Sequence, residues 1–303
     1  MRFVVTGSNG LVGSRVCAQL EQRGHEVVGI GRGARRTGGA HRYIPVDLTL
    51  EADVLTALDT AAPDAVIHPA SMTEVDACER APDQAYAANV TAAMAVAKGA
   101  RKVGAHLVHV STDYVFDGNA GPYDEEARPN PRGVYALTKH MGEQAAQSFV
   151  PGCAIARTAV VYGWPPAGRP NFGAWLVGAL EKGQTVKLFE DQFVAPSLAD
   201  SVAAMLVELG ERKLGGIWNT CGGEVVNRVS FGRALCEVFG FDPGLLVPSR
   251  MADLKLASPR PLHSGLKADK ARAQLQAKPL ALNESLQRFH AAWKAGTTPV
   301  RGA

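Results

Sequence analysis

The sequence predicts an α/β fold built on a doubly wound parallel sheet, with helices on both of its faces. Two observations carry this prediction. Short apolar runs with the length of buried strands alternate with segments of helical periodicity through the first 160 residues. The first of these runs leads directly into a glycine-rich turn and a helix, as a βαβ unit requires. Beyond residue 160 the alternation becomes less regular, so residues 161–303 are expected to form mainly a smaller lobe, with some segments returning to the sheet.

Each expected strand is a short apolar run that ends at a polar or glycine-containing turn. The expected strands are residues 3–6, 26–30, 43–46, 65–68, 107–110, 153–157, 185–189 and 216–220. Helical periodicity favours helices after Gly13 and over 51–61, 82–102, 135–149, 172–180, 200–209, 230–239 and 283–293. Gly24 and Gly104 end two of these helices, because glycine tolerates the left-handed conformation that closes a helix. Asn89, inside the helix over 82–102, either braces the strand at 107–110 or bonds its own helix.

Composition excludes several classes of protein. The 303 residues carry a formal net charge of +3, which is too small to indicate a nucleic-acid partner. No apolar run approaches the ~20 residues of a membrane helix, and the first strand begins too early for a secretory leader to precede it. The five cysteines are widely spaced, so we expect free thiols in a reducing cytoplasm. No spacing of the histidines indicates a metal site, and no metal is expected.

The turn after the first strand has the context of a dinucleotide-binding turn. The helix that follows presents free N–H groups and a positive dipole end to a diphosphate, and glycines let the backbone approach it. The spacing Gly-x-x-Gly-x-x-Gly differs from the usual Gly-x-Gly-x-x-Gly, but its place between strand and helix favours a cofactor over a structural turn. The residues expected to contact the cofactor here are Gly7, Ser8, Asn9, Gly10, Leu11, Val12 and Gly13.

The second strand ends without the carboxylate that binds the ribose hydroxyls of NAD. It is followed instead by Arg32, Arg35 and Arg36. Arginine can hold a 2′-phosphate with its fork of donors, so we expect NADP(H), bound chiefly by Arg32 with help from Arg35. The alternative is a solvated basic loop. After the third strand, Asp47 either faces the adenine of the cofactor or caps the following helix. Its neighbour Leu48 is also expected to contact the cofactor.

A stretch from Ser111 to Lys139 combines a Ser-Thr pair with Tyr-x-x-x-Lys, two patterns that are typical of turns and of surface pairs unless a nicotinamide binds nearby. Ser111 and Thr112 follow an apolar strand, at the end where open α/β sheets place their chemistry. Tyr135 and Lys139 are four residues apart, so they share one face of a helix. A lysine cation favours phenolate, and a phenol poised in this way can act as a general acid toward a carbonyl oxygen. Ser111 or Thr112 can hold the same oxygen through a second hydrogen bond.

With these motifs placed, the sequence resembles the extended short-chain dehydrogenase/reductase family over nearly its whole length. Within that family it is most similar to the dTDP-4-dehydrorhamnose reductases. The motifs that carry the resemblance are TGSNGLVG (6–13), STDYVFDG (111–118), YALTK (135–139), RTAVVYG (157–163) and NF (171–172). The resemblance implies a Rossmann fold in which residues 1–160 bind NADP and residues 161–303 form mainly the substrate-binding lobe.

The resemblance also implies roles for single residues. Tyr135 would protonate the C4 carbonyl oxygen of a dTDP-4-dehydro-6-deoxy sugar as hydride arrives from NADPH. Lys139 would lower the pKa of Tyr135 and hold the nicotinamide ribose, and Thr112 or Ser111 would orient the substrate oxygen.

Two further groups of residues are implied in the same way. Pro69 and Ala70 would line the path of the cofactor's adenosine or ribose. Tyr114, Trp164 and Asn171 are candidates for the sugar or the nucleotide of the substrate. Their alternative roles are those of core aromatic residues and of a loop cap.

Other functions remain as alternatives. A 4,6-dehydratase of this family has Asp-Glu directly after the threonine, and Tyr114 stands where that glutamate would be. A reductase of another ketone or aldehyde would use the same catalytic set, and a non-catalytic NADP-binding regulatory subunit is the alternative from a different class. We expect a cytoplasmic protein with a small-molecule substrate, no nucleic-acid or membrane partner and, on base rates alone, a homodimeric state.

Overall fold

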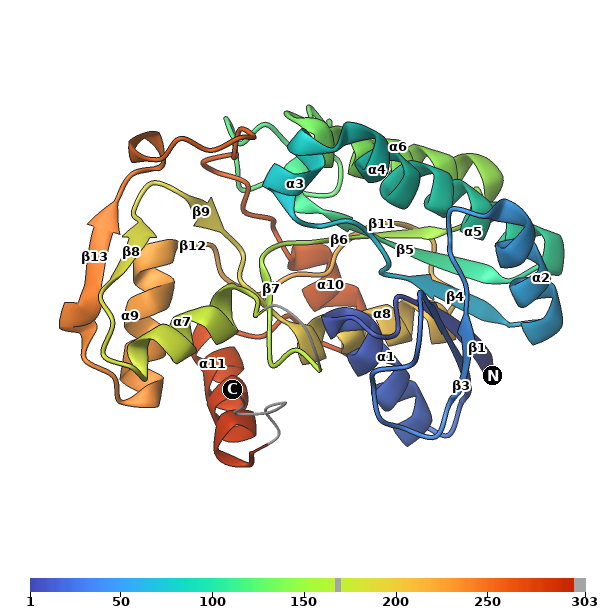
Figure 1. Cartoon of the computed structure of the whole chain (residues 1–303), viewed down its shortest axis with the longest axis horizontal. Coiled ribbons are helices and arrows are strands. Elements are labelled where there is room, and N and C mark those ends of the chain that lie inside the picture. The colour runs from blue at the N-terminus through green and yellow to red at the C-terminus, as the bar shows by residue number, and fades with distance from the viewer. Residues whose placement is uncertain (167–169, 297–303) are drawn as a thin grey trace.

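The computed structural model describes residues 1–166 and 170–296 (Figure 1). Its central element is a seven-stranded parallel sheet in the order β11-β6-β5-β4-β1-β2-β3. Its strands are β1 (Arg2–Thr6), β2 (Glu26–Gly31), β3 (Arg42–Pro45), β4 (Ala65–His68), β5 (His106–Thr112), β6 (Ala154–Thr158) and β11 (Gly216–Asn219). The predicted doubly wound α/β fold is confirmed, and each of these strands begins and ends within two residues of its predicted bounds.

Helices cover both faces of the sheet (Figure 1). One face carries α1 (Leu11–Gln22) and α8 (Ala199–Glu211), and the other carries α2 (Glu51–Ala61), α5 (Ala92–Val103) and α6 (Val134–Phe149). Because successive side chains of a strand point to opposite faces, Val5 and Ile67 join one core while Val4 and Val66 join the other. A strand that is buried on both faces is apolar at every position, which explains the continuous apolar runs in the sequence.

The strand order reverses between β1 and β4. From β1 the chain moves outward through β2 and β3, and then it crosses back to β4 and continues in the other direction through β5 and β6. Connections on the two sides of this point leave in opposite directions, which opens a crevice beyond the carboxyl ends of the strands. The fold therefore predicts a ligand site next to the ends of β1, β4 and β5.

A smaller lobe occupies the left of Figure 1. It contains α7 (Phe172–Leu180), α9 (Arg228–Phe239), α11 (Leu282–Lys294) and the parallel pair β8 (Val186–Phe189) and β13 (Leu246–Ser249). Its own core is formed by side chains that include Leu176, Phe231 and Phe289. The remaining elements are α3 (Val75–Arg80), α10 (Asp269–Gln274), β7 (Val161–Tyr162) paired with β10 (Ser197–Leu198), β9 (Phe193–Val194) paired with β12 (Val226–Asn227), and 3₁₀ turns at Asp113–Val115, Pro243–Leu245 and Met251–Asp253.

The long helix predicted over 82–102 is not regular along its whole length. It begins as α4 (Pro82–Tyr86), passes through a π-helical turn at Ala87–Thr91 and continues as α5. It ends at the predicted Gly104, which has φ 70°. Such π turns occur frequently at functional sites, and this one contains Asn89.

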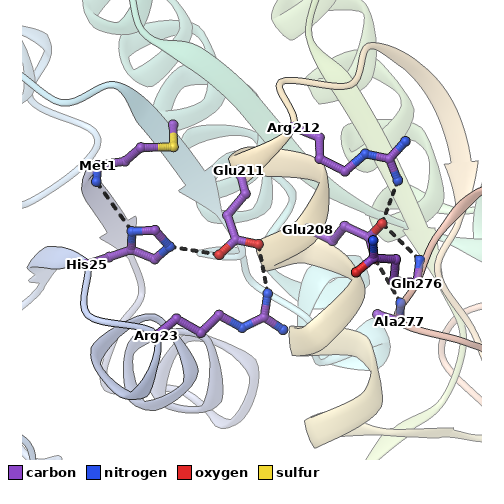
Figure 2. A network of polar contacts seen from close by, with 8 residues as sticks. All are labelled: Met1, Arg23, His25, Glu208, Glu211, Arg212, Gln276 and Ala277. Atoms are coloured by element: carbon purple, nitrogen blue, oxygen red, sulfur yellow. Dashed lines mark hydrogen bonds and ion pairs between the residues drawn. The ribbon is translucent and has the colours of Figure 1, made fainter.

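Two carboxylates of α8 connect distant parts of the chain (Figure 2). Glu211 lies 2.7 Å from Arg23 Nη1 and 2.7 Å from His25 Nε2, which belong to the segment between α1 and β2. Glu208 accepts hydrogen bonds from the backbone N–H groups of Gln276 at 2.9 Å and Ala277 at 2.8 Å. One helix therefore holds both an early turn and a late segment against the same face of the sheet.

The cysteines, Cys17, Cys78, Cys153, Cys221 and Cys236, are all buried and free. Burial raises the pKa of the Cys17 thiol to about 12, so this group is a poor nucleophile at neutral pH. Within the described ranges, no helix is both long enough and apolar enough to cross a membrane.

Candidate active site

A cavity of about 910 Å³ lies in the crevice that the strand order predicts. It runs from the glycine turn after β1, past the end of β5, to α7 and the first residue of α9 in the smaller lobe. This volume is in the range of small-molecule and cofactor sites. The predicted site residues line it with three exceptions, which are Ser8, Arg35 and Trp164.

The glycine turn forms a backbone cradle at one end of the cavity. Gly7 has φ 57°, and a Cβ atom on Gly13 would lie 2.3 Å from the Gly7 carbonyl oxygen, so neither position accepts a side chain without a shift. Helix α1 begins directly after Gly10, whose lack of a side chain leaves the first N–H groups uncapped. A short glycine turn that opens onto uncapped helix N–H groups fits the diphosphate of a dinucleotide.

Ser8 belongs to this motif but does not face the cavity. Its side chain is fully buried against β2, where a Cβ atom on Gly29 would lie 2.7 Å from the Ser8 hydroxyl. Ser8 therefore belongs to the glycine turn, but its side chain packs against the sheet.

The basic loop after β2 is held in a defined shape by Asn9. The Asn9 amide donates to the Ala34 carbonyl at 3.1 Å, and its oxygen accepts from the Arg36 backbone N–H at 2.8 Å. Arg32 and Arg36 are exposed and line the cavity, so two guanidinium groups flank its outer end.

Arg35 has a different role from the predicted one. Its guanidinium donates to the carbonyl oxygens of Thr37, Gly38, Gly39 and His41 at 2.7–2.9 Å. It therefore closes the basic loop on itself and is not placed along the cavity. Arg36, for which no separate role was predicted, lines the cavity instead of Arg35.

Asp47 lies on the cavity but does not cap the following helix, because α2 begins after Leu50 and has no side-chain cap. Its Oδ1 accepts from the Thr49 backbone N–H at 3.0 Å and the Thr49 hydroxyl at 2.8 Å. These hydrogen bonds lower the pKa of Asp47. Leu48, Pro69 and Ala70 also line the cavity, and Ala70 lies close enough to Gly7 to exclude a side chain there.

The catalytic candidates meet where β5 faces α6. Thr112 is the last residue of β5, and its hydroxyl lies close enough to Tyr135 to lower the pKa of that phenol. Lys139, one turn further along α6, donates from Nζ to the Val110 carbonyl oxygen at 2.7 Å. Tyr135 is 8 % exposed and Lys139 is 3 % exposed, so both groups act in surroundings with little water. Ser111 lines the cavity beside them.

Burial decides the protonation of this pair. It raises the pKa of Tyr135 above that of a free phenol, with the Thr112 hydroxyl acting in the opposite direction. The same burial lowers the pKa of Lys139 to about 8, and the Glu143 charge opposes that change. Burial therefore outweighs the lowering of the Tyr135 pKa that was expected from Lys139. Tyr135 keeps its proton at neutral pH, as a general acid must.

A buried ion pair lies behind Lys139 and was not foreseen from the sequence. Glu143, one turn after Lys139 on α6, accepts from Arg157 Nε and Nη2 of β6, both at 2.9 Å. Burial alone would raise the Glu143 pKa, but the hydrogen bonds from Arg157 and His140 and the Arg157 charge hold it at about 2. Glu143 therefore stays charged and favours the charged form of Lys139.

Asn89 connects the two sides of the site. From the π turn, its side chain accepts from the Met72 N–H at 2.8 Å and donates to the Met72 carbonyl at 3.2 Å and to Thr138 Oγ1 at 3.1 Å. The sequence left open whether Asn89 braces β5 or bonds its own helix. Its side chain does neither in the hydrogen bonds described. Instead it fixes the segment after β4 to the helix that carries Tyr135 and Lys139.

The other end of the cavity is lined by Tyr114, Asn171, Phe172 and Arg228. The Tyr114 ring meets the Tyr135 ring edge-on, with their centroids 5.8 Å apart. Asn171 caps α7 by accepting from the Ala174 N–H at 3.2 Å, so its predicted alternative role as a cap is met while it also lines the cavity.

Trp164 is a core residue of the smaller lobe. It stacks on Phe289 at 4.4 Å, and its indole N–H donates to the Phe289 carbonyl oxygen at 3.0 Å. Trp164 does not line the cavity, and the role observed for it is the alternative one of a core aromatic residue. Phe172 and Arg228 were not predicted, and Arg228 had no local motif to mark it.

The cavity offers a carbonyl oxygen the phenol of Tyr135 and the hydroxyl of Ser111, which has no hydrogen-bond partner among the described residues. The Thr112 hydroxyl already donates to Asp113 Oδ1. A protonated phenol and a second hydroxyl in a desolvated site favour the negative charge that grows on the carbonyl oxygen during reduction. Among residues 1–166 and 170–296, no group of three or more His, Cys, Asp or Glu side chains is placed to hold a metal ion.

Comparison with known proteins identifies related chains. The model of the RmlD substrate-binding domain family matches residues 1–294. The probable low-salt glycan biosynthesis reductase Agl14 of Haloferax volcanii is 36 % identical over 97 % of this chain and 98 % of its own. A dTDP-4-dehydrorhamnose reductase of Streptomyces griseus is 34 % identical over 88 % of this chain and 85 % of its own.

A solved structure agrees with these matches. The crystal structure of a dTDP-4-dehydrorhamnose reductase from Clostridium acetobutylicum superposes with a TM-score of 0.87 and 27 % identity. The superposition covers 97 % of this chain and all of that one. The similarity therefore extends over the sheet and the smaller lobe together.

Proposed function

From the premise that this chain belongs to the RmlD substrate-binding domain family, within the extended short-chain dehydrogenases/reductases, we propose that it reduces the C4 keto group of a dTDP-4-dehydro-6-deoxy sugar with NADPH. The observation that carries the proposal is the buried, protonated Tyr135 beside Thr112 and Lys139, in one cavity with a dinucleotide cradle. The names of the related reductases support the choice of a nucleotide sugar.

The residues of this chain have distinct tasks in the proposed reaction. A bound nicotinamide supplies hydride to the carbonyl carbon. Tyr135 transfers its phenolic proton to the carbonyl oxygen, and Ser111 or Thr112 holds that oxygen in place. Lys139, kept charged by Glu143, favours the phenolate that Tyr135 becomes and offers donors to a ribose.

The preference for NADP(H) over NAD(H) is proposed from the basic loop. Arg32 and Arg36 line the outer end of the cavity, and β2 ends without a carboxylate to bind a ribose 2′-hydroxyl. Two guanidinium groups suit a 2′-phosphate, which accepts several charge-assisted hydrogen bonds.

Replacement of Arg32 tests this preference. In Arg32→Ala we expect the ratio of kcat/KM for NADPH to that for NADH to fall roughly 10- to 100-fold, because one charged hydrogen-bond partner of the phosphate is lost. Arg42→Ala, at an exposed position outside the cavity, is the matched control and should leave the ratio unchanged. An unchanged ratio in Arg32→Ala would remove Arg32 from the account.

Two other functions use parts of the same site. Dehydration needs an acid and a base after the threonine, and Tyr114 at that place supplies no carboxylate. A regulatory subunit would need the cradle but not the protonated Tyr135 beside Thr112, so the complete catalytic set favours an enzyme.

The direct test is NADPH oxidation with dTDP-4-dehydrorhamnose, beside a panel of small ketones and aldehydes. We expect turnover of the nucleotide sugar with kcat/KM well above that of each small carbonyl compound. Faster reduction of a small carbonyl compound would identify a different reductase. Tight NADPH binding with no turnover of any carbonyl would support the regulatory alternative.

A further inference from the structure

Arg228 is a charged side chain in the cavity that the proposed chemistry does not use. It is the first residue of α9 and lines the end of the cavity formed by the smaller lobe, beside Phe172 and Tyr114. A guanidinium group removed from water is costly unless each of its donors finds an acceptor. Its surroundings therefore indicate what the group is placed to bind.

Two neighbours fix the orientation of the guanidinium. Arg228 Nε donates to the Gln192 side-chain oxygen at 2.9 Å, and Gln192 is itself 2 % exposed. The guanidinium lies 4.5 Å from the centre of the Phe172 ring, which favours its charge and fixes its plane. The group is therefore held rigidly before any ligand arrives.

One donor of this oriented group is left without an acceptor. Arg228 Nη1 is buried and has no hydrogen-bond partner among the described residues. Asp113 interacts electrostatically with Arg228, but its two oxygens accept from Thr112 at 3.0 Å and from Ser264 at 2.6 Å. An unpaired buried donor of this kind costs roughly 1–3 kcal/mol, which a ligand oxygen would offset.

The neighbours also show which part of the substrate Arg228 faces. Gln192 accepts from Arg228 and lies near Tyr114, whose pKa it lowers. Tyr114 in turn contacts Tyr135, with 5.8 Å between ring centroids. Arg228, Tyr114 and Tyr135 line one cavity, so a sugar whose carbonyl meets Tyr135 would extend toward Arg228.

We propose that Arg228 is a specificity-determining residue that donates a charge-assisted hydrogen bond to an oxygen substituent of the sugar ring. The assignment rests on the proposed function, since it places a sugar at Tyr135. It explains how the site selects an oxygen-rich sugar over a plain ketone, because a ligand without that oxygen leaves Nη1 unpaired.

The test compares two probes by calorimetry in the presence of NADP⁺: dTDP-rhamnose, the product of the proposed reaction, and dTDP, which lacks the sugar. In Arg228→Met we expect the Kd for dTDP-rhamnose to rise roughly 10- to 100-fold and the Kd for dTDP to change less than threefold. Arg228→Lys, which keeps a charge without the fork of donors, should lie between wild type and Arg228→Met. If Arg228→Met does not fold, the Kd values of Arg228→Lys for dTDP-rhamnose and for dTDP decide the test.

Arg233→Met is the matched control, because Arg233 is exposed on the same helix and lies outside the cavity. An equal loss of affinity for both probes in Arg228→Met would place the contact on the diphosphate and overturn the assignment. Unchanged affinity for dTDP-rhamnose would overturn it as well. If the wild-type chain binds NADPH but not dTDP-rhamnose, the proposed function fails, and the assignment fails with it.

Discussion

Tyr135 and Lys139 show how one environment moves two pKa values in opposite directions. Desolvation penalises whichever form is charged, so it raises the pKa of the phenol and lowers that of the ammonium. The phenol therefore stays protonated, and the ammonium becomes the group that titrates near the working pH. The alkaline side of the activity profile should report Lys139 rather than Tyr135.

We predict that kcat/KM falls as pH rises through about 8, where folded Lys139 loses its proton. The unfolded chain keeps that proton to about pH 10.5, so the contribution of Lys139 to stability rises with pH across the same window. A fall in activity without a matching fall in Tm would separate titration from unfolding.

Lys139→Arg is the control for this assignment. Arginine stays charged throughout this range, so the residual activity of the variant should lack the fall near pH 8. The same alkaline fall in the variant would assign the titration to another group.

The sequence identified residues whose relation is local and missed those whose relation is not. Tyr135 and Lys139 are four residues apart, and a helix brings them together by its geometry alone. Glu143 meets Arg157 only because β6 pairs beside β5, and Arg228 enters the cavity from the other lobe. The spacing of residues along the sequence shows neither that a charged side chain is buried nor which distant residue it contacts.

Motif membership also left side-chain direction undetermined. Ser8 lies inside the glycine turn and Arg35 inside the basic loop, yet one packs against the sheet and the other binds loop carbonyls. The direction of each side chain depends on the neighbours that the folded chain places around it.

At the scale of elements, the π turn over Ala87–Thr91 is the feature that most directly serves the site. It places Asn89 where three hydrogen bonds join the segment after β4 to α6. An Ala-rich helical pattern looks the same with or without a π turn, so the sequence predicted one continuous helix. The strands were predicted closely because burial on both faces leaves an apolar run with sharp ends.

We predict that Asn89→Ala lowers the free energy of unfolding by about 1–3 kcal/mol, since it leaves the part-buried backbone N–H of Met72 without its acceptor and removes one donor from the Met72 carbonyl. It should also lower kcat, because Met72 lines the cavity. Urea denaturation and steady-state kinetics measure the two effects.

Asn283→Ala, on the exposed surface of α11, is the matched control and should change stability by less than about 0.5 kcal/mol. Equal stabilities for Asn89→Ala and wild type would show that the three hydrogen bonds do not support the site.

At the scale of the whole molecule, the sheet and the smaller lobe together enclose one cavity. Helix α8 holds the turn between α1 and β2 and the connection between α10 and α11 to the same face of the sheet (Figure 2). The pairing of β8 with β13 joins segments far apart in the chain. The sequence predicted a strand near β8 but could not predict its partner, because pairing depends on contacts that propensity does not encode.

We predict that Glu208→Gln destabilises the protein by about 1–3 kcal/mol at pH 7, because Gln276 and Ala277 lose a charged acceptor. These hydrogen bonds, with Arg212, hold the Glu208 pKa below its usual value although burial opposes them. The stabilisation is therefore present above about pH 4.5 and is lost as pH falls through the folded-state pKa.

Thermal unfolding of both proteins from pH 3 to 7 checks this prediction. The difference in Tm between wild type and Glu208→Gln should shrink at low pH. Glu284→Gln, which removes an exposed pair with Arg288, should have little effect throughout. A pH-independent difference for Glu208→Gln would contradict the assignment to its charge.

The central claim is that the chain delivers hydride to the C4 carbonyl of a nucleotide sugar while Tyr135 supplies the proton. The most direct measurement uses NADPH with deuterium at the transferred position, dTDP-4-dehydrorhamnose as acceptor, and NMR of the product. The account predicts one deuterium at C4 for each NADPH oxidised, and a loss of roughly 10²- to 10⁴-fold in rate for Tyr135→Phe with NADPH affinity retained. Deuterium elsewhere, or a Tyr135→Phe variant as fast as wild type, would contradict it.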